Sequence, residues 1–263
     1  PFLSVVDSID PIASYFEECL RNGVTTAAVV PGNSTLIGGQ AAILKTSGQY
    51  VNDMLLRREA GLKLSLRPSR GNRMSQLARL RKELDRAKRF IEQKDEKTEA
   101  AEAANGDKKD GESEASDGDK PAEGETEQAS ADAAQRQAIA TSDEASLKAL
   151  AAALKGEVPV YIYCDNGMDV TAALTLVKEY GLQPIFILGQ ECYQAAALLG
   201  ERGETVILDP TLVFWKTNER TRKDEKIVLP KLYAEAKVPF VFQTDNGGSR
   251  SSIGSDYFWY QAA

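Results

Sequence analysis

The sequence predicts an α/β protein built on a parallel sheet, and three observations carry that prediction. In the second half of the chain, strand-like runs alternate with helical patterns at short spacing. This alternation is typical of parallel strands joined by crossover helices, in a sheet that is either open or closed into a barrel. The run at 24–30, VTTAAVV, carries no charge, as expected of a strand covered on both faces. The chain has 263 residues, of which 42% are hydrophobic, so it can bury a substantial core.

The first part of the chain is predicted to form a helix, three strands and a second helix. Asp10 and Pro11 open a short helix as N-cap and first helical residue, and Gly23 ends it. The strand at 24–30 leads into a glycine-rich loop at 31–40, and strand-like runs follow at 41–45 and 62–66. Apolar residues at helical spacing across 74–91 predict an amphipathic helix packed on the core.

The second part supplies the alternating pattern. Strand-like runs occupy 158–163, 184–188, 205–208 and 238–243, and helical patterns cover 142–156, 170–181, 192–203 and 229–237. The charged stretch 216–226 is predicted to be a solvated loop. Trp215 and Trp259 are expected to anchor packing, and Cys19 and Cys192 to be buried neutral thiols.

Between these parts lies an acidic segment that we predict to be a disordered insertion, which divides the globular body into residues 1–92 and 142–263 around residues 93–141. Residues 101–130 hold ten acids against three lysines, and alanine is their only apolar residue. Such a segment cannot bury enough surface to offset its ordering entropy. The rest of the chain holds 29 acids (39 minus 10) and 29 bases (32 minus 3). This balance predicts neither a nucleic-acid nor an anionic-membrane partner.

The ends of the chain bear on its compartment. No apolar run approaches the roughly 20 residues that cross a bilayer, so we expect a soluble protein. The sequence begins at Pro1 without methionine and stops at Ala263 within an apparent helix start. We therefore expect a piece of a longer protein whose N-terminus is missing, and the compartment stays open.

Polar residues follow three of the predicted strands and are the candidate site. Tyr163 and Asp165 end the first of these strands, Glu191 follows the second and Asp245 the third. Ligands bind at the carboxyl ends of parallel strands, so we expect these side chains to face one site. Strand alternation places Tyr163 and Asp165 on one face and Cys164 on the other. The two aspartates would serve acid/base chemistry, a weak Mg²⁺ or Ca²⁺ site, or loop capping.

The same segments resemble the metal-dependent amidohydrolases, and within them the group similar to imidazolonepropionase. The resemblance rests on GVTTAAVVPGNSTLIGGQAAILK (23–45), AGLKLSL with RMSQLARLRKELDRAKRF, VPVYIYCDNGMDVTAALTLVKEYGL, GQECYQAAALL and VPFVFQTDN. It implies a TIM-barrel-like (β/α)8 domain that lacks its first strand here. The implied chemistry is hydrolysis of non-peptide C–N bonds, often in cyclic amides, by water activated on zinc or another divalent metal.

Departures from the family pattern predict that the metal chemistry is lost. Family members carry two histidines around one residue at the end of the fifth strand, where this chain has Tyr163 and Asp165. They carry another at the end of the sixth strand, where it has Leu188, and the chain contains no histidine at all. Asp245 matches the family's catalytic aspartate, although Asn246 replaces the usual histidine after it. Because zinc needs about three protein ligands, mostly imidazole, we expect no bound metal and a catalytically degenerate domain.

Two alternatives stay open. The loop headed by Cys164 is similar to the sulfurtransferase (rhodanese) pattern, in which backbone N–H groups cradle a persulfide on a reactive cysteine. The other alternative is a non-catalytic binding or scaffold module that holds a small polar molecule, or that associates with an active amidohydrolase domain or with a second copy of itself. The residues expected to bind such a molecule are Asn33, Gly38, Gly39, Gln40, Tyr163, Asp165 and Glu191.

Overall fold

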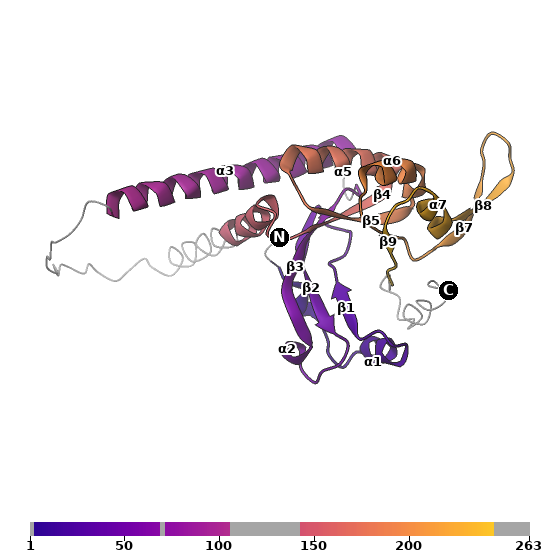
Figure 1. The fold of residues 1–263 in the computed structure, drawn as a ribbon, viewed down its shortest axis with the longest axis horizontal. Coiled ribbons are helices and arrows are strands. Elements are labelled where there is room, and N and C mark those ends of the chain that lie inside the picture. The colour runs from indigo at the N-terminus through magenta and orange to yellow at the C-terminus, as the bar shows by residue number, and fades with distance from the viewer. Residues whose placement is uncertain (1–2, 69–71, 106–142, 245–263) are drawn as a thin grey trace, which may run out of the picture.

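A seven-stranded sheet forms the centre of the molecule, with the strand order β1-β2-β3-β4-β5-β6-β9 (Figure 1). The structure is a computed structural model that describes residues 3–68, 72–105 and 143–244. The strands are β1 Thr26–Val29, β2 Ile37–Lys45, β3 Leu55–Ser65, β4 Val160–Asn166, β5 Pro184–Glu191, β6 Val206–Ile207 and β9 Phe240–Val241. Over the described residues the sheet is open, with β1 and β9 at its edges, so this part of the chain does not form a closed barrel.

The sheet is mixed rather than parallel throughout. From β3 to β9 neighbouring strands run parallel, as the alternating pattern predicted, whereas β1, β2 and β3 pair antiparallel. The expectation of a doubly covered parallel strand at 24–30 is therefore wrong, because β1 is an edge strand that alternates between exposed and half-buried residues. The predicted loop at 31–40 ends early, since Ile37 already begins β2. The connection between β1 and β2 is too short for a parallel crossover, which needs a dozen or more residues.

Helices lie at the predicted positions, with shifted bounds, and two short helices at 5–8 and 51–54 were not predicted. They are η1 Val5–Ser8, α1 Ser14–Arg21, α2 Val51–Met54, α3 Arg73–Asn105, a helix over 143–154, α5 Gly167–Tyr180, η2 Cys192–Ala195, α6 Ala196–Arg202 and α7 Leu229–Glu235. Ala13 rather than Asp10 is the N-cap of α1; the Asp10 carboxylate accepts the Ile12 N–H in the preceding turn, at 3.1 Å. Within the described ranges, no helix combines the length and apolar character needed to span a membrane.

The long helix α3 extends into the segment that was predicted to be a disordered insertion. It continues past the predicted boundary to Asn105, so residues 93–105 are helical. In Figure 1 its far end projects beyond the sheet, while its first turns pack on the body. Leu80, Leu84 and Ala87 are at most 1% exposed there, which confirms the predicted packing for the middle of the face, whereas Met74 at its start is 79% exposed. Residues 106–141 of the insertion lie outside the described residues.

The main hydrophobic core lies between the sheet and the helices that cover one of its faces. Leu64, Ile162 and Phe186 point into this core from β3, β4 and β5, and each is at most 1% exposed. Burying a side chain of this size stabilises the fold by about 1.5–3 kcal/mol. The intervening strand residues point to the opposite face, where they form a smaller cluster. That cluster consists of Ala41, Ala60, Tyr161, Tyr163 and Ile187.

A separate hairpin projects from the body after β6 (Figure 1). It is formed by β7 Val213–Thr217 and β8 Asp224–Val228, so the loop predicted at 216–226 includes strand residues on both sides of a turn. Phe214 packs inward against Tyr193, with ring centroids 6.1 Å apart. Its neighbour Trp215 points outward and is 67% exposed, so its expected role as a packing anchor is wrong. Trp259 lies outside the described residues.

Candidate functional site

Tyr163 and Asp165 meet at the carboxyl end of β4, on the face that the alternation predicted. The Tyr163 hydroxyl donates to Asp165 Oδ1 at 2.9 Å. Lys63 of β3 is 1% exposed and places its Nζ 5.3 Å from the centroid of the Tyr163 ring. Burial, and then the hydrogen bond to Asp165, raise the pKa of the Tyr163 phenol well above its usual range. The phenol is therefore a neutral hydrogen-bond donor at ordinary pH.

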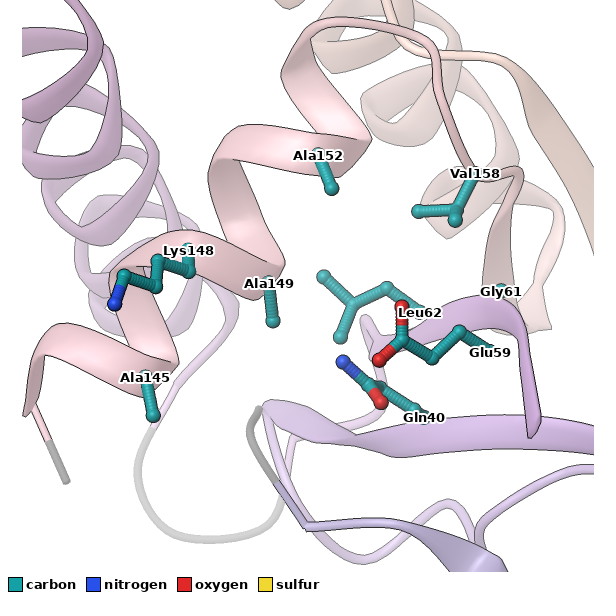
Figure 2. A pocket seen from close by; sticks show the side chains of 9 residues that line it. All are labelled: Gln40, Glu59, Gly61, Leu62, Ala145, Lys148, Ala149, Ala152 and Val158. Carbon is teal, nitrogen blue, oxygen red and sulfur yellow. The ribbon is translucent and has the colours of Figure 1, made fainter.

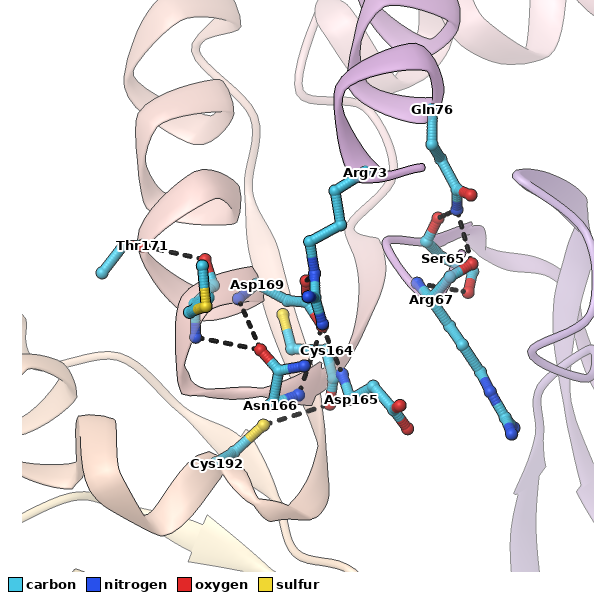
Figure 3. A network of polar contacts seen from close by, with 11 residues as sticks. Ser65, Arg67, Arg73, Gln76, Cys164, Asp165, Asn166, Asp169, Thr171 and Cys192 are labelled. Carbon is cyan, nitrogen blue, oxygen red and sulfur yellow. Dashed lines mark hydrogen bonds and ion pairs between the residues drawn. The ribbon is translucent and has the colours of Figure 1, made fainter. Parts of the chain in front are cut away.

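Asp169 holds the backbone of this strand end in place (Figure 3). Its carboxylate is 2% exposed and accepts hydrogen bonds from the backbone N–H groups of Asp165 and Asn166, each at 3.2 Å. Arg73 of α3 pairs with the other carboxylate oxygen at 2.7 Å. Asn166 caps α5 and forms a capping box with Asp169. This role was not predicted, although the spacing of Asn166 and Asp169 is a capping-box signal.

The other acidic side chains at this edge of the sheet are engaged as well. Glu191, expected to bind substrate, forms an ion pair with Lys216 of the β7–β8 hairpin. The Lys216 ammonium also lies 5.6 Å from the centroid of the Tyr193 ring. Asp209, which follows β6, accepts the Thr211 N–H at 2.8 Å. Glu191 thus links the hairpin to β5.

The four residues of the predicted glycine loop separate in space. Asn33 lies near the carboxyl end of β3, where its carbonyl oxygen accepts the Ser65 hydroxyl at 2.9 Å. Gly38 lies against Lys63, so a Cβ at this glycine would be 3.0 Å from the Lys63 Cβ. Gly39 and Gln40 instead adjoin the N-terminal segment, since a Cβ on Gly39 would be 2.4 Å from a backbone oxygen there. Because β2 runs antiparallel to β3, successive residues of β2 lie farther from the carboxyl end of β3, where the candidate site is.

Gln40 lines a different pocket, beside the middle of β3 and the amino end of β4. Figure 2 shows its amide beside the carboxylate of Glu59, opposite the helix over 143–154. The pocket has a volume of about 280 Å³, and Ala149 and Ala152 form its wall on the helix. The structure therefore does not bring Gln40 together with Tyr163 and Asp165, and its grouping with them was wrong.

Two further residues, Asp245 and Leu188, were matched to family site residues by the resemblance to the amidohydrolases. Asp245, the catalytic candidate, lies outside the described residues. Leu188 does not line the site, because it is 1% exposed in the helix-covered core, paired in register with Cys164. Alternation instead turns Ile187 and Gly189 of β5 toward the face of Tyr163. Leu188 therefore does not face the position of the family's histidine, to which the resemblance assigned it, and that assignment was wrong by one residue in the register.

The three cysteines are buried free thiols, as expected for Cys19 and Cys192. Cys164 is 0% exposed, and burial raises the pKa of its thiol well above the usual value. Cys192 donates its S–H to the Cys164 carbonyl oxygen at 3.1 Å. A sulfurtransferase needs an accessible cysteine that ionises readily, so this geometry speaks against that alternative.

The donor set at the carboxyl edge does not suit a transition-metal ion. In the described part of the chain, no three side chains among histidine, cysteine, aspartate and glutamate are grouped so that they could hold one. Asp165, Asp169 and Glu191 each accept hydrogen bonds from protein donors. A metal would have to displace these donors, and no imidazole is present to take their place.

Comparisons with known proteins support the fold and go no further. No protein-family model matches the chain, and no curated protein matches it. A solved structure described as the crystal structure of an amidohydrolase from Thermotoga maritima MSB8 is similar, with a TM-score of 0.69 and 18% sequence identity. The match covers 100% of this chain and 60% of that one, so the chain spans less than two thirds of its neighbour's length. The mixed α/β fold of this chain is thus similar to that of the matched part of this structure.

Proposed function

We propose that this chain is an amidohydrolase-type domain in which the metal site has been replaced by hydrogen-bonded side chains, and that it binds a small polar molecule without metal-dependent hydrolysis. The observation that carries the proposal is the hydrogen bond from Tyr163 to Asp165 at the end of β4. At the end of this strand, amidohydrolases of the family that the chain resembles carry two metal-binding histidines. The same resemblance, with the likeness in fold, supports a (β/α)8 barrel of which the open sheet is one part.

The chemistry of the pair favours binding over metal catalysis. A neutral phenol is a poor metal ligand, and the pKa of Tyr163 is raised by burial and by Asp165. The phenol occupies one oxygen of the Asp165 carboxylate, and within the described part of the chain no hydrogen bond engages the second, which is open to a ligand. Asp169 and Arg73 hold the backbone of Asp165, so the carboxylate is presented from a fixed strand end. Such a site suits a ligand that donates hydrogen bonds, such as an amide or an ammonium group.

The proposal is tested by metal analysis of the purified chain. The protein is produced in medium supplemented with zinc, iron and manganese, and metal content is measured by mass spectrometry after gel filtration. We expect less than about 0.1 equivalent of any of these metals, and unchanged thermal stability after treatment with a chelator. Turnover of a panel of cyclic amides should not exceed that of a Tyr163→Phe, Asp165→Asn variant. One tightly held metal per chain, or metal-dependent turnover, would falsify the proposal.

A further inference from the structure

A second and larger cavity lies on the face of the sheet opposite the main core. It has a volume of about 760 Å³ and is bounded by α1, β1, the strands β4 to β6, and residues 241–244. Residues of β1 and of β6 line it together although these strands are far apart in the sheet order, so the sheet curls around it. Tyr163, Asp165 and Glu191 do not line this cavity. The cavity is therefore separate from the site of the proposed function.

The walls of this cavity are apolar and uncharged. Val30, Ile185, Ile187 and Ile207 form much of the lining, and none of the described lining residues carries a formal charge. Val30, Ile185 and Ile207 also pack against the small cluster that contains Ile187. The cavity is thus continuous with a hydrophobic surface, and a ligand that enters it exchanges water for apolar contacts.

A few neutral polar groups interrupt the apolar lining. Tyr161 and Thr205 contribute hydroxyls from β4 and the start of β6, and Gln243 contributes an amide. At the rim, the hydroxyls of Tyr15 and Thr244 lie 3.0 Å apart and join α1 to the segment after β9. Burial raises the pKa of both tyrosines, so they stay neutral across the physiological range. The lining therefore offers hydrogen bonds but no charge to a ligand.

We infer that this cavity binds a neutral, largely apolar small molecule that carries one or two hydrogen-bonding groups. The volume falls within the range of about 300–1,000 Å³ typical of small-molecule sites, which also combine apolar walls with a few polar groups. A charged ligand would lose its hydration without gaining a counter-ion from the described lining, so charge should oppose binding. A fused aromatic ring system with one amide or amine fits these constraints.

The test uses the 263-residue chain and the neutral fluorophore N-phenyl-1-naphthylamine. We expect saturable fluorescence enhancement at one probe per chain. Ala28 lies on β1, lines the cavity and is exposed, so Ala28→Trp fills the space without disturbing the core. This variant should weaken probe binding at least about tenfold, and Ala28→Leu should weaken it less. The control Met74→Trp introduces the same side chain on α3, where Met74 is 79% exposed, and should leave binding unchanged.

Competition on the unmodified protein tests the ligand class without any substitution. 1-Naphthaleneacetamide should displace the probe, and 1-naphthaleneacetate, matched in size but charged, should be at least about tenfold weaker. Equal displacement by the two compounds would overturn the inference, as would loss of binding in Met74→Trp. Native mass spectrometry tests whether a second copy of the chain, and not a small molecule, occupies the cavity. A dimer that dissociates in Ala28→Trp would assign the cavity to a second copy of the chain and refute the small-molecule site.

Discussion

Removal of the Asp169 carboxylate should destabilise the protein more than removal of its ionic partner. Asp169 is 2% exposed and accepts hydrogen bonds from the backbone N–H groups of Asp165 and Asn166 as well as from Arg73. Asp169→Ala leaves two backbone donors without their acceptor, at about 1 kcal/mol each. It also leaves the guanidinium without its partner, which adds about 1 kcal/mol because that side chain is partly exposed. We expect a loss of about 3 kcal/mol in the free energy of unfolding.

Arg73→Ala should cost less. The Asp169 carboxylate then keeps both backbone donors, and water can reach it through the space left by a side chain that was 38% exposed. We expect a loss of about 1–2 kcal/mol. The surface pair of Glu17 and Arg21, with both side chains more than 60% exposed, supplies the control: Glu17→Ala should change stability by less than about 0.5 kcal/mol.

The assay is urea unfolding at 25 °C, followed by circular dichroism and fitted to two states for each variant. The slope of free energy against urea should be the same for all variants if their native and unfolded states are comparable. An Arg73→Ala loss equal to or larger than that of Asp169→Ala would refute the reasoning. It would mean that the ion pair, and not the two backbone hydrogen bonds, is the main contribution of this carboxylate.

Three further predictions follow from the geometry of the strand ends. Tyr163→His with Asp165→His places two imidazoles on one face of β4, and should raise zinc affinity at least about tenfold over the unmodified chain in a dye-competition assay. Gly189→Ala puts a Cβ 2.8 Å from the Asp165 carbonyl oxygen, and should cost about 1–3 kcal/mol in urea unfolding, whereas Gly32→Ala meets no atom within 4 Å and should be neutral. Burial raises the pKa of the Cys192 thiol to about 12. Its stabilising contribution is complete below the unfolded pKa of about 8.5 and should fall by about 2 kcal/mol by pH 10, measured as the difference from Cys192→Ala.

Each of these predictions has an outcome that contradicts it. If the double histidine variant binds zinc no better than the unmodified chain, the strand end lacks the geometry of a former metal site. If Gly189→Ala is as stable as Gly32→Ala, β4 and β5 are not packed as closely as described. If the difference from Cys192→Ala stays constant between pH 8 and pH 10, the thiol is not protected from ionisation in the folded state.

Local patterns in the sequence predicted the parallel half of the protein well. The strands around Ile162 and Phe186 are short apolar runs bounded by helices with their own start and stop signals, so each element could be recognised from its neighbours alone. The same-face placement of Tyr163 and Asp165 also followed from the two-residue period of a strand, and their hydrogen bond bears this out. The capping role of Asp169 was not predicted, although its spacing from Asn166 is a local sequence signal.

The face and partner of each residue depended on strand pairing, which local patterns do not specify. The run at 24–30 suits a buried parallel strand as well as an antiparallel edge strand, and only the short connection to Ile37 in the folded sheet decided between them. Leu188 was misplaced because a one-residue difference in register exchanges the two faces of a strand. Gln40 was grouped with the wrong site because β2 starts near the carboxyl end of β3 and runs antiparallel to it, so Gln40 lies away from that end.

The sequence by itself therefore determined which segments form the parallel strands and their crossover helices in the second half of the chain, although not the β7–β8 hairpin, and that no histidine is available for a metal. The tertiary structure alone decided that Tyr163 is neutral and bonded to Asp165, that Cys164 is inaccessible, and that an uncharged cavity lies on the other face of the sheet. The physical reason is that composition and periodicity act over a few residues. Burial, hydrogen bonding and cavity shape arise from segments far apart in sequence that only the folded sheet brings together.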